Sequence, residues 1–399
     1  MSTTSGNTNL KLNTIPDGKL GIIAIDGIDE LAKSIDKYIV QWRRERSAEL
    51  SSLAALDDFF VKDSYIVNAS NPRFGSGEAK GTVASTVRGD DIYILVDICN
   101  YSKTYKINGY ENCKSPDDYF QDLKRIIAAV RGSCRRVNVV MPYLYEGRQM
   151  KRNGRESLDC ASSLQELESL GVSSIITFDA HDIRVQNAIP LISFETFQAS
   201  YQFLKNVLRD APDMKVDKEN LMIISPDESG MNRAIYLANV IGVDMGTFYR
   251  RRDYSQHAKD GSSPIVELEF LGADVKGKDM IVLDDMISSG KTITEIATTL
   301  KRRGANRIYI CATFGMFTWG FDWIDKAYAD GLFTKIITTN LIYQPKELLE
   351  KEWYISCDMS KYLAMIIDTL NHDASIANLL NPSDRIKKVL KKHENHEEI

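Results

Sequence analysis

The chain has 399 residues, enough for two domains of ordinary size, and 43% of them are apolar, enough for substantial cores. A net charge of −5 excludes general attraction to nucleic acid or to anionic membranes. Six scattered cysteines without a C-x-x-C pair do not make a disulfide framework or a zinc site, and no apolar run is long enough to cross a bilayer. We therefore expect a soluble cytoplasmic protein that binds neither nucleic acid nor membrane.

Apolar runs typical of buried strands alternate with amphipathic segments typical of helices from residue 21 onward. The predicted strands are residues 21–25, 64–67, 91–98, 136–141, 173–178, 221–225, 246–249, 265–271, 280–283, 307–314 and 335–339. Residues 100–116 are polar and are predicted to form a surface loop. The alternation predicts an α/β fold of two similar domains, each a mainly parallel sheet flanked by helices.

The expected domain organisation follows from where these two series begin and end. It comprises a mobile tail over 1–18, an N-terminal domain over 19–190, a C-terminal domain over 191–350, a strand and helix over 351–382 that pack back on the core, and a charged tail over 383–399.

The most informative stretch is the predicted strand 280–283 and the residues that follow it. Two carboxylates, Asp284 and Asp285, come next, then a small hydroxylated turn and a helix. The first turn of a helix offers unpaired N–H groups and the positive end of the helix dipole, which attract a phosphate. Carboxylates just upstream can accept hydrogen bonds from the vicinal hydroxyls of a sugar. The stretch therefore predicts a site for a sugar phosphate.

A phosphate loop of the G-x-x-x-x-G-K-[ST] type is the main rival interpretation, because Gly290, Lys291 and Thr292 match its end. The first glycine of that pattern would fall on Asp285, whose carboxylate would repel the phosphates. The acidic pair followed by Ser-Ser-Gly-Lys-Thr instead resembles the phosphoribosyl-binding motif of type I phosphoribosyltransferases.

Further polar groups follow other predicted strands, where open α/β sheets place ligands. Asp179 and His181 follow one strand, Asp227 follows another, and Arg250 to Arg252 follow a third, ahead of a polar stretch over 253–263 with the composition of a lid. A basic loop after residue 141 carries four cations within eight residues, Arg148 to Arg155.

Taken in order, these segments resemble the ribose-phosphate diphosphokinase family, also called phosphoribosyl diphosphate synthetases. The resemblance covers roughly residues 20–380. The segments that carry it are FGSGE (74–78) with Arg88-Gly89, PYLYEGRQ (142–149) with Arg155-Glu156, FDAH (178–181), SPDESG (225–230), YRRRD (249–253), LDDMISSGKT (283–292) and TTNLIYQPKE (338–347).

The resemblance implies two phosphoribosyltransferase-like domains with the active site at their junction. ATP would donate its β,γ-diphosphate, with Mg²⁺, to the C1 hydroxyl of ribose 5-phosphate, giving phosphoribosyl diphosphate and AMP. It also implies a homo-oligomer, dimer or hexamer, in which N-terminal elements of a site can come from the neighbouring subunit.

The family's site residues map onto this sequence motif by motif. The resemblance implies ATP binding by Phe74, Gly77, Glu78, Arg148 and Gln149; magnesium binding by His181 and Asp227; catalysis by Arg250 and Arg252 on a mobile loop; and phosphoribosyl binding by Asp284, Asp285, Ser288, Ser289, Gly290, Lys291 and Thr292.

The sequence departs from the family pattern in four places. Arg250 stands where the catalytic loop normally has lysine, Lys291 stands where the phosphate loop normally has glycine, and Met150 replaces an acidic residue in a loop that is one residue short. Residues 43–60 and 100–115 look like insertions. Arginine and lysine are not interchangeable at such sites, because their donor geometries differ.

These departures leave three alternatives beside the main interpretation. One is the same transfer to a larger acceptor such as ADP-ribose, whose second phosphate would lie near Lys291 and whose product would feed NAD synthesis. Another is a catalytically weak regulatory paralogue, suggested by Arg250. A nucleobase transferase is a weaker alternative, because only the motif around Asp284 is shared with those enzymes.

Overall fold

The computed structural model describes residues 12, 16–49, 61–152, 154–252 and 265–399. Within them the chain forms two compact units. The first comprises Met1–Thr177, Val185–Glu195 and Met359–Leu380, and the second comprises Phe178–Arg184, Thr196–Asp358 and Asn381–Ile399. Among the described residues, no helix has both the length and the apolar character that crossing a bilayer requires.

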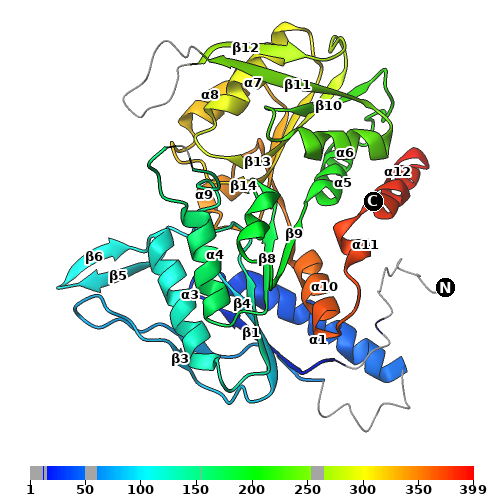
Figure 1. The fold of residues 1–399 in the computed structure, drawn as a ribbon. Coiled ribbons are helices and arrows are strands. Elements are labelled where there is room, and N and C mark those ends of the chain that lie inside the picture. Colours follow the sequence, from blue (N-terminus) through cyan, green and yellow to red (C-terminus); the bar gives the residue numbers. More distant parts are fainter. Residues whose placement is uncertain (1–11, 13–15, 50–60, 153, 253–264) are drawn as a thin grey trace. The chain divides into compact units, whose positions relative to one another are not determined.

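A five-stranded sheet, in the order β1-β4-β7-β8-β9, forms the centre of the first unit, and β1, β4, β7 and β8 pair in parallel (Figure 1). Its strands are β1 (Lys19–Ala24), β4 (Asp90–Leu95), β7 (Arg136–Val140), β8 (Ser174–Phe178) and β9 (Ser193–Phe197). Almost every residue of β4 and β7 is buried, as expected for strands covered on both faces.

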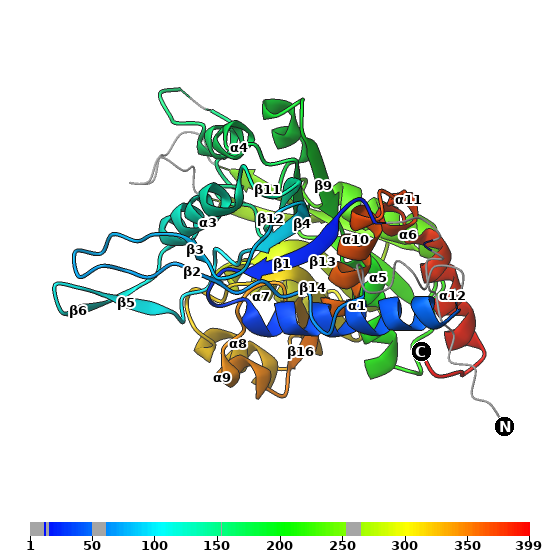
Figure 2. The same cartoon turned by 90° about the horizontal axis from the view of Figure 1, so that it is seen from below.

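Helices cover both faces of this sheet, with α3 and α4 on one side and α1 and α10 on the other (Figure 2). Their bounds are α1 (Asp29–Glu49), α3 (Pro116–Val130), α4 (Asp159–Ser169) and α10 (Ser360–Asn371). Helix α10 is fastened to α1 through buried Asp368, which accepts from Arg43 Nε at 2.9 Å and from Arg46 Nη2 at 2.7 Å. Two short helices follow β8 and α10 in the sequence: η2 (Ile183–Ala188) and α11 (Ala377–Leu380).

Two antiparallel hairpins project from the first unit: β2 (Ala69–Ser70) with β3 (Thr82–Val83), and β5 (Thr104–Ile107) with β6 (Tyr110–Cys113) (Figure 1). The surface loop predicted over 100–116 is therefore wrong. Asn108 and Gly109 have φ of 50° and 86°, and an Asn-Gly pair with positive φ closes a two-residue hairpin turn.

The second unit contains a seven-stranded sheet in the order β12-β11-β10-β13-β14-β15-β16, parallel except for the antiparallel edge pair β11–β12. The strands are β10 (Leu221–Ser225), β11 (Asp244–Arg252), β12 (Ile265–Leu271), β13 (Asp279–Ile287), β14 (Ile308–Gly315), β15 (Lys335–Thr339) and β16 (Tyr354–Cys357). The helices are α5 (Ser200–Asp210), α6 (Met231–Ile241), α7 (Lys291–Arg302), α8 (Asp322–Ala329), α9 (Lys346–Leu349) and α12 (Ser383–Glu394).

Two strands of the second unit are longer than the sequence predicted. Strand β13 runs through both carboxylates to Ile287, because Met286 and Ile287 still pair with Phe314 and Gly315 of β14. Strand β11 continues to Arg252 and pairs with β12, with a register shift between Arg251 and Arg252. In β13 the apolar run marked only fully buried residues.

Candidate active site

The two carboxylates at the end of β13 have different surroundings. Asp284 is half-buried and accepts the backbone N–H of Asp285 at 2.8 Å. Asp285 is buried, and both of its carboxylate oxygens are engaged: Oδ1 accepts the N–H of Met286 at 2.8 Å, and Oδ2 lies 2.5 Å from Nδ1 of His181. Asp284 is thus the more accessible of the pair.

The environment also separates the pKa values of the two carboxyl groups. Burial and the adjacent charge of Asp285 raise the pKa of Asp284 well above its usual range. Burial would also raise the pKa of Asp285, but the hydrogen bond with His181 and the charge of Arg233 lower it. The pair therefore contains one carboxylate held ionised and one carboxyl that gains a proton easily, as carboxyl groups in close contact do.

His181, which follows β8, forms a hydrogen bond with Asp285, and the sequence motifs alone could not reveal this contact. The hydrogen bond with Asp285 raises the pKa of His181 against the opposing effect of burial, and the nearby carboxylate of Asp227 adds to the increase. The structure of the second unit therefore brings together three of the predicted residues from three separate motifs, His181, Asp227 and Asp285.

Two further residues belong to this cluster: Asp179, which the sequence analysis placed at a strand end without a specific role, and Arg233, which it did not name. Arg233, on α6, donates from Nε to buried Asp179 at 2.9 Å, and Asp179 also accepts the hydroxyl of Thr313. The charge of Arg233 acts on Asp284 and Asp285 as well. Asp179 has φ of 38°, an uncommon conformation for a residue other than glycine. Asp179 lies within the FDAH segment, which was the available signal, whereas Arg233 lay outside every quoted motif.

A magnesium ion fits the residues proposed to hold it. His181 uses Nδ1 for Asp285, which leaves Nε2 as the ring nitrogen for a ligand, and metal-binding histidines are commonly oriented by a carboxylate in this way. Asp227 offers carboxylate oxygen, and its Oδ1 is fixed by the N–H and hydroxyl of Ser229. Among the described residues no group of three or more potential ligand side chains occurs. Mg²⁺ commonly relies on one or two protein ligands, substrate phosphates and water.

The predicted phosphate loop lies between β13 and α7. Gly290 has φ of 85°, and a Cβ there would lie 2.9 Å from Ile324 Cδ1, so both the turn and the packing require glycine. The amide of Thr318 donates to the carbonyl of Ser288 at 2.8 Å and steadies the loop. Helix α7 begins at Lys291, so its first amides point toward the loop.

The predicted catalytic arginines are not in a loop. Arg250 and Arg252 lie on β11, where Arg250 is in register with Leu268 of β12. The prediction that these two residues lie on a mobile loop is therefore wrong, because their backbones belong to a strand. The polar stretch 253–263 lies outside the described residues.

The predicted adenine-binding residues lie in the first unit, on the turn between β2 and β3. The Phe74 N–H donates to the Glu78 carbonyl at 2.7 Å, and the Gly77 N–H donates to the Phe74 carbonyl at 2.9 Å. Phe74 is 54% exposed although its backbone is tied down in this way. An exposed aromatic ring on an ordered turn can serve as a stacking platform for a base.

Arg148 and Gln149 lie in the loop after β7. The side-chain amide of Gln149 donates to the carbonyl of Ser157 at 2.9 Å and to that of Lys151 at 3.3 Å, so it organises its own loop. Arg148 is exposed. Whether these two residues contact ATP stays a prediction.

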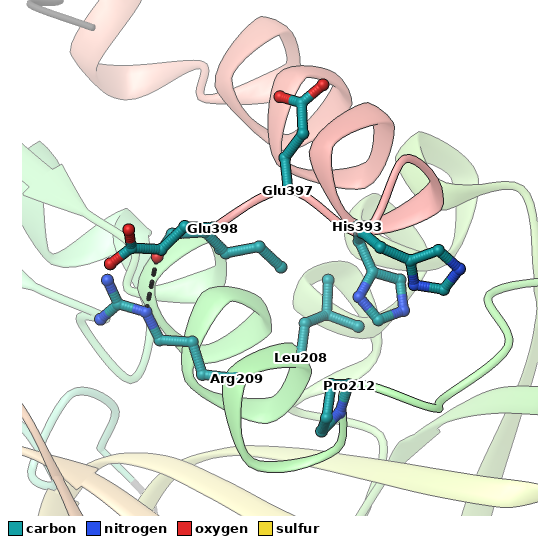
Figure 3. Close-up of a pocket in the computed structure, with 8 residues that line it drawn as sticks. Leu208, Arg209, Pro212, His393, Glu397 and Glu398 are labelled. Carbon is teal, nitrogen blue, oxygen red and sulfur yellow. Dashed lines mark hydrogen bonds between the residues drawn. The ribbon is translucent and has the colours of Figure 1, made fainter. Parts of the chain in front are cut away.

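A pocket in the second unit is formed by α5 and the C-terminal residues (Figure 3). Arg209 Nε donates to the carbonyl oxygen of Ile399 at 2.8 Å, and His393 and Glu397 also line the pocket. None of the predicted site residues lines it, so it does not contribute to the candidate site.

Two family models match the sequence. The model described as the N-terminal domain of ribose phosphate pyrophosphokinase matches residues 20–171, and that described as the phosphoribosyl transferase domain matches residues 196–340. The first covers the turn with Phe74, and the second covers the carboxylates and the phosphate loop.

Similar proteins extend over most of the chain. A ribose-phosphate pyrophosphokinase of Vibrio parahaemolyticus is 27% identical over 79% of this chain and 91% of its own length. One from Gloeobacter violaceus is 30% identical over 69% of this chain and 74% of its own length. The crystal structure of phosphoribosylpyrophosphate synthetase from Mycobacterium smegmatis superposes with a TM-score of 0.68 at 20% identity, over 89% of this chain and all of that one. The predicted fold of two phosphoribosyltransferase-like domains is thereby confirmed.

Proposed function

Because the chain belongs to the ribose-phosphate pyrophosphokinase family and is therefore a diphosphokinase, we propose that it transfers the β,γ-diphosphate of ATP to the C1 hydroxyl of ribose 5-phosphate. The products are phosphoribosyl diphosphate and AMP. The observation that supports this most strongly is the cluster of His181, Arg233 and the two carboxylates of β13, directly ahead of a glycine turn and a helix N-terminus.

The acceptor is bound by the second unit in this proposal. The 5-phosphate lies on the turn of Ser288 to Thr292, where the N–H groups at the start of α7 and the helix dipole stabilise its charge. The half-buried Asp284 receives the vicinal hydroxyls of the ribose. Asp285 is occupied by His181 and by the Met286 amide, so it acts mainly by orienting the imidazole and balancing the charge of Arg233.

The donor is ATP, with adenine stacked on Phe74 and its edge near Glu78, and with further contacts from Gly77, Arg148 and Gln149. His181 and Asp227 would hold Mg²⁺, which when bound lowers the negative charge that the incoming hydroxyl meets. The oxygen of the C1 hydroxyl attacks the β-phosphorus and loses its proton, while the bond from the β-phosphorus to the oxygen bridging to the α-phosphorus breaks and AMP leaves. Arg250 and Arg252 neutralise the charge that develops during this transfer.

The test is a direct product assay. The protein is incubated with Mg-ATP and either ribose 5-phosphate or ADP-ribose, and AMP and the diphosphorylated acceptor are followed by mass spectrometry. We expect AMP and phosphoribosyl diphosphate to form in equal amounts with ribose 5-phosphate. If neither acceptor yields AMP, the proposal fails and the regulatory paralogue becomes the better interpretation.

Transfer to a larger acceptor such as ADP-ribose is the second candidate, and Lys291 is the observation that favours it. Its side chain is 60% exposed at the first position of α7, and its nearest ionic partner, Glu295, is 3.9 Å away. An exposed cation beside the phosphate loop is well placed for a second phosphate of the acceptor. If Lys291 binds such a phosphate, Lys291→Gly will lower activity with ADP-ribose more than activity with ribose 5-phosphate. An unchanged ratio of the two activities would remove the reason for this candidate.

A further inference from the structure

The hairpin β5–β6 contacts the turn that carries Phe74, and we propose that its function is to hold that turn in the conformation that binds the adenine of ATP. This inference rests on the proposed function for the identity of the ligand, but the contacts themselves do not depend on it. They fall within the first unit, and they involve a segment, residues 104–113, that the sequence interpretation treated as a surface loop within an insertion.

The first contact joins the two backbones. The N–H of Asn108, at the tip of the β5–β6 hairpin, donates to the carbonyl of Gly75 at 2.9 Å. Gly75 lies between Phe74 and Glu78, the two residues proposed to contact adenine. The hydrogen bond therefore ties the tip of one hairpin to the middle of the other turn.

The second contact is apolar. A Cβ built on Gly77 would lie 2.9 Å from Cγ1 of Ile107, so the Ile107 side chain occupies the space directly above the Gly77 backbone. Gly77 also has φ of 93°, a conformation that favours glycine. The turn can approach Ile107 this closely only because position 77 has no side chain.

The third contact runs through Arg73, the residue before Phe74. Its guanidinium lies over the ring of Tyr105, 4.3 Å from the ring centroid, and its Nη1 donates to the carbonyl of Gly77 at 3.1 Å. Arg73 also reaches the buried carboxylate of Asp122 at 3.1 Å, and the Tyr105 hydroxyl donates to Asp118 at 3.1 Å. The hairpin and the first turns of α3 together fix the Arg73 side chain. Through its hydrogen bond to the Gly77 carbonyl, Arg73 then fixes the segment that carries Phe74.

These contacts matter because Phe74 itself is exposed and has little packing of its own to keep it in place. If only a fraction of the molecules have the binding conformation, the apparent affinity for the ligand is reduced in proportion to that fraction. Fixing the backbone on either side of an exposed aromatic ring removes that loss before the ligand arrives. Ile107 and Tyr105 are thus positioning residues for the nucleotide.

The test compares two substitutions on one strand. Ile107→Ala removes the side chain that covers Gly77, whereas Lys106→Ala changes an exposed neighbour on the opposite face of β5, because side chains alternate along a strand. Two readouts are taken for each variant: hydrogen exchange of the amides of residues 74–78 without nucleotide, and the KM values for ATP and for ribose 5-phosphate. Circular dichroism confirms that each variant is folded.

For Ile107→Ala we expect faster exchange at Phe74 and Gly77 and a KM for ATP raised about 5- to 10-fold, with the KM for ribose 5-phosphate unchanged. Lys106→Ala should match the parent protein in both readouts. Unchanged exchange in Ile107→Ala would overturn the holding role, and faster exchange with an unchanged KM for ATP would overturn its link to the nucleotide. If the parent protein does not use ATP at all, the proposed function fails, and exchange alone decides whether the hairpin holds the turn.

Discussion

In each unit the first parallel strand of the sheet has a later segment of the chain on either side. In the second unit β10 lies between β11 and β13. In the first unit β1 lies between β4 and residues 65–67, where Ile22 donates to the Tyr65 carbonyl and accepts from Val67. The segment beside β10 leads into the antiparallel pair that carries Arg250 and Arg252, and the segment beside β1 leads into the antiparallel pair that carries the turn with Phe74.

The two units differ at the end of the next strand. Strand β13 carries two carboxylates near its end and is followed by a short glycine turn before α7, whereas β4 leads through Asp97 and Asn100 into the β5–β6 hairpin before α3. In our proposals the second unit uses this position to bind a ligand, whereas the first unit uses it to support a neighbouring turn. If these proposals hold, residues placed at a strand end, more than the fold itself, determine what each unit binds.

The largest effect is expected where the two strand ends differ. Asp285→Asn removes the carboxylate that pairs with His181 and whose charge interacts with that of Arg233, so we expect kcat/KM to fall about 1000-fold. Asp97→Asn is the matched change at the buried carboxyl after β4, which accepts the N–H of Cys99, and it should stay within about three-fold of the parent. Steady-state kinetics on folded proteins measure both, and equal losses in the two variants would abolish the distinction between the units.

The next largest effect concerns the antiparallel pair β11–β12, which carries Arg250 and Arg252. If Arg250 and Arg252 act on charge that develops during transfer, replacing either by alanine should lower kcat about 100-fold and leave the KM for ribose 5-phosphate nearly unchanged. Arg251→Ala is the control, because no role is assigned to that neighbour. A raised KM with an unchanged kcat would show that these arginines bind the substrate only in its ground state.

Phe74→Ala should weaken the binding of the donor, ATP, and leave the binding of the acceptor unchanged. Stacking of a base on an aromatic ring contributes about 1–3 kcal/mol, so the KM for ATP should rise roughly 10-fold or more. The KM for ribose 5-phosphate should not change, and Phe74→Trp should restore most of the affinity for ATP. Titrations of each substrate at saturating concentrations of the other provide the measurement. A matching change in both KM values would contradict the assignment of adenine to this turn.

The smallest effect is an acid dependence confined to the first unit. Burial alone would raise the pKa of Asp368, but the charges of Arg43 and Arg46 hold it below its usual range. A carboxyl whose folded pKa is depressed stabilises the protein above the ordinary value near 4 and loses that contribution as the pH falls through the folded value.

We therefore expect the free energy of unfolding to decrease as the pH drops below about 4. The decrease is roughly 1.4 kcal/mol for each pH unit by which the folded pKa of Asp368 lies below its ordinary value. Urea unfolding at several pH values measures this quantity. Asp368→Asn should be less stable at neutral pH and should show a weaker dependence on acid. The same acid dependence in both proteins would mean that other groups cause it.

Much of the fold followed from pattern alone, because buried parallel strands are continuous apolar runs and the motifs lie at their ends. The predictions failed where pairing extends beyond the apolar run. Asp284, Met286 and Ile287 still complete the ladder with β14, and an Asn-Gly turn closes a hairpin whose strands are mostly exposed. That Asn-Gly pair was a signal in the sequence, and it was not used.

The candidate site was predictable as a set of motifs but not as a network. Its residue types and order indicated phosphate, sugar and metal binding. The hydrogen bond of His181 to Asp285 joins residues 104 positions apart, and that of Arg233 to Asp179 joins residues 54 positions apart. Such contacts depend on which strands lie side by side, and a single sequence carries no direct signal for that.

In the proposed reaction an intact diphosphate moves from ATP to the C1 hydroxyl of a ribose 5-phosphate acceptor. Phosphorus NMR of a reaction with Mg-ATP and ribose 5-phosphate follows this transfer itself. We expect the ATP resonances to be replaced by those of AMP and by two coupled resonances of a diphosphate on the sugar, in equal amounts. Formation of ADP with a singly phosphorylated C1, or release of free phosphate without any sugar diphosphate, would contradict it.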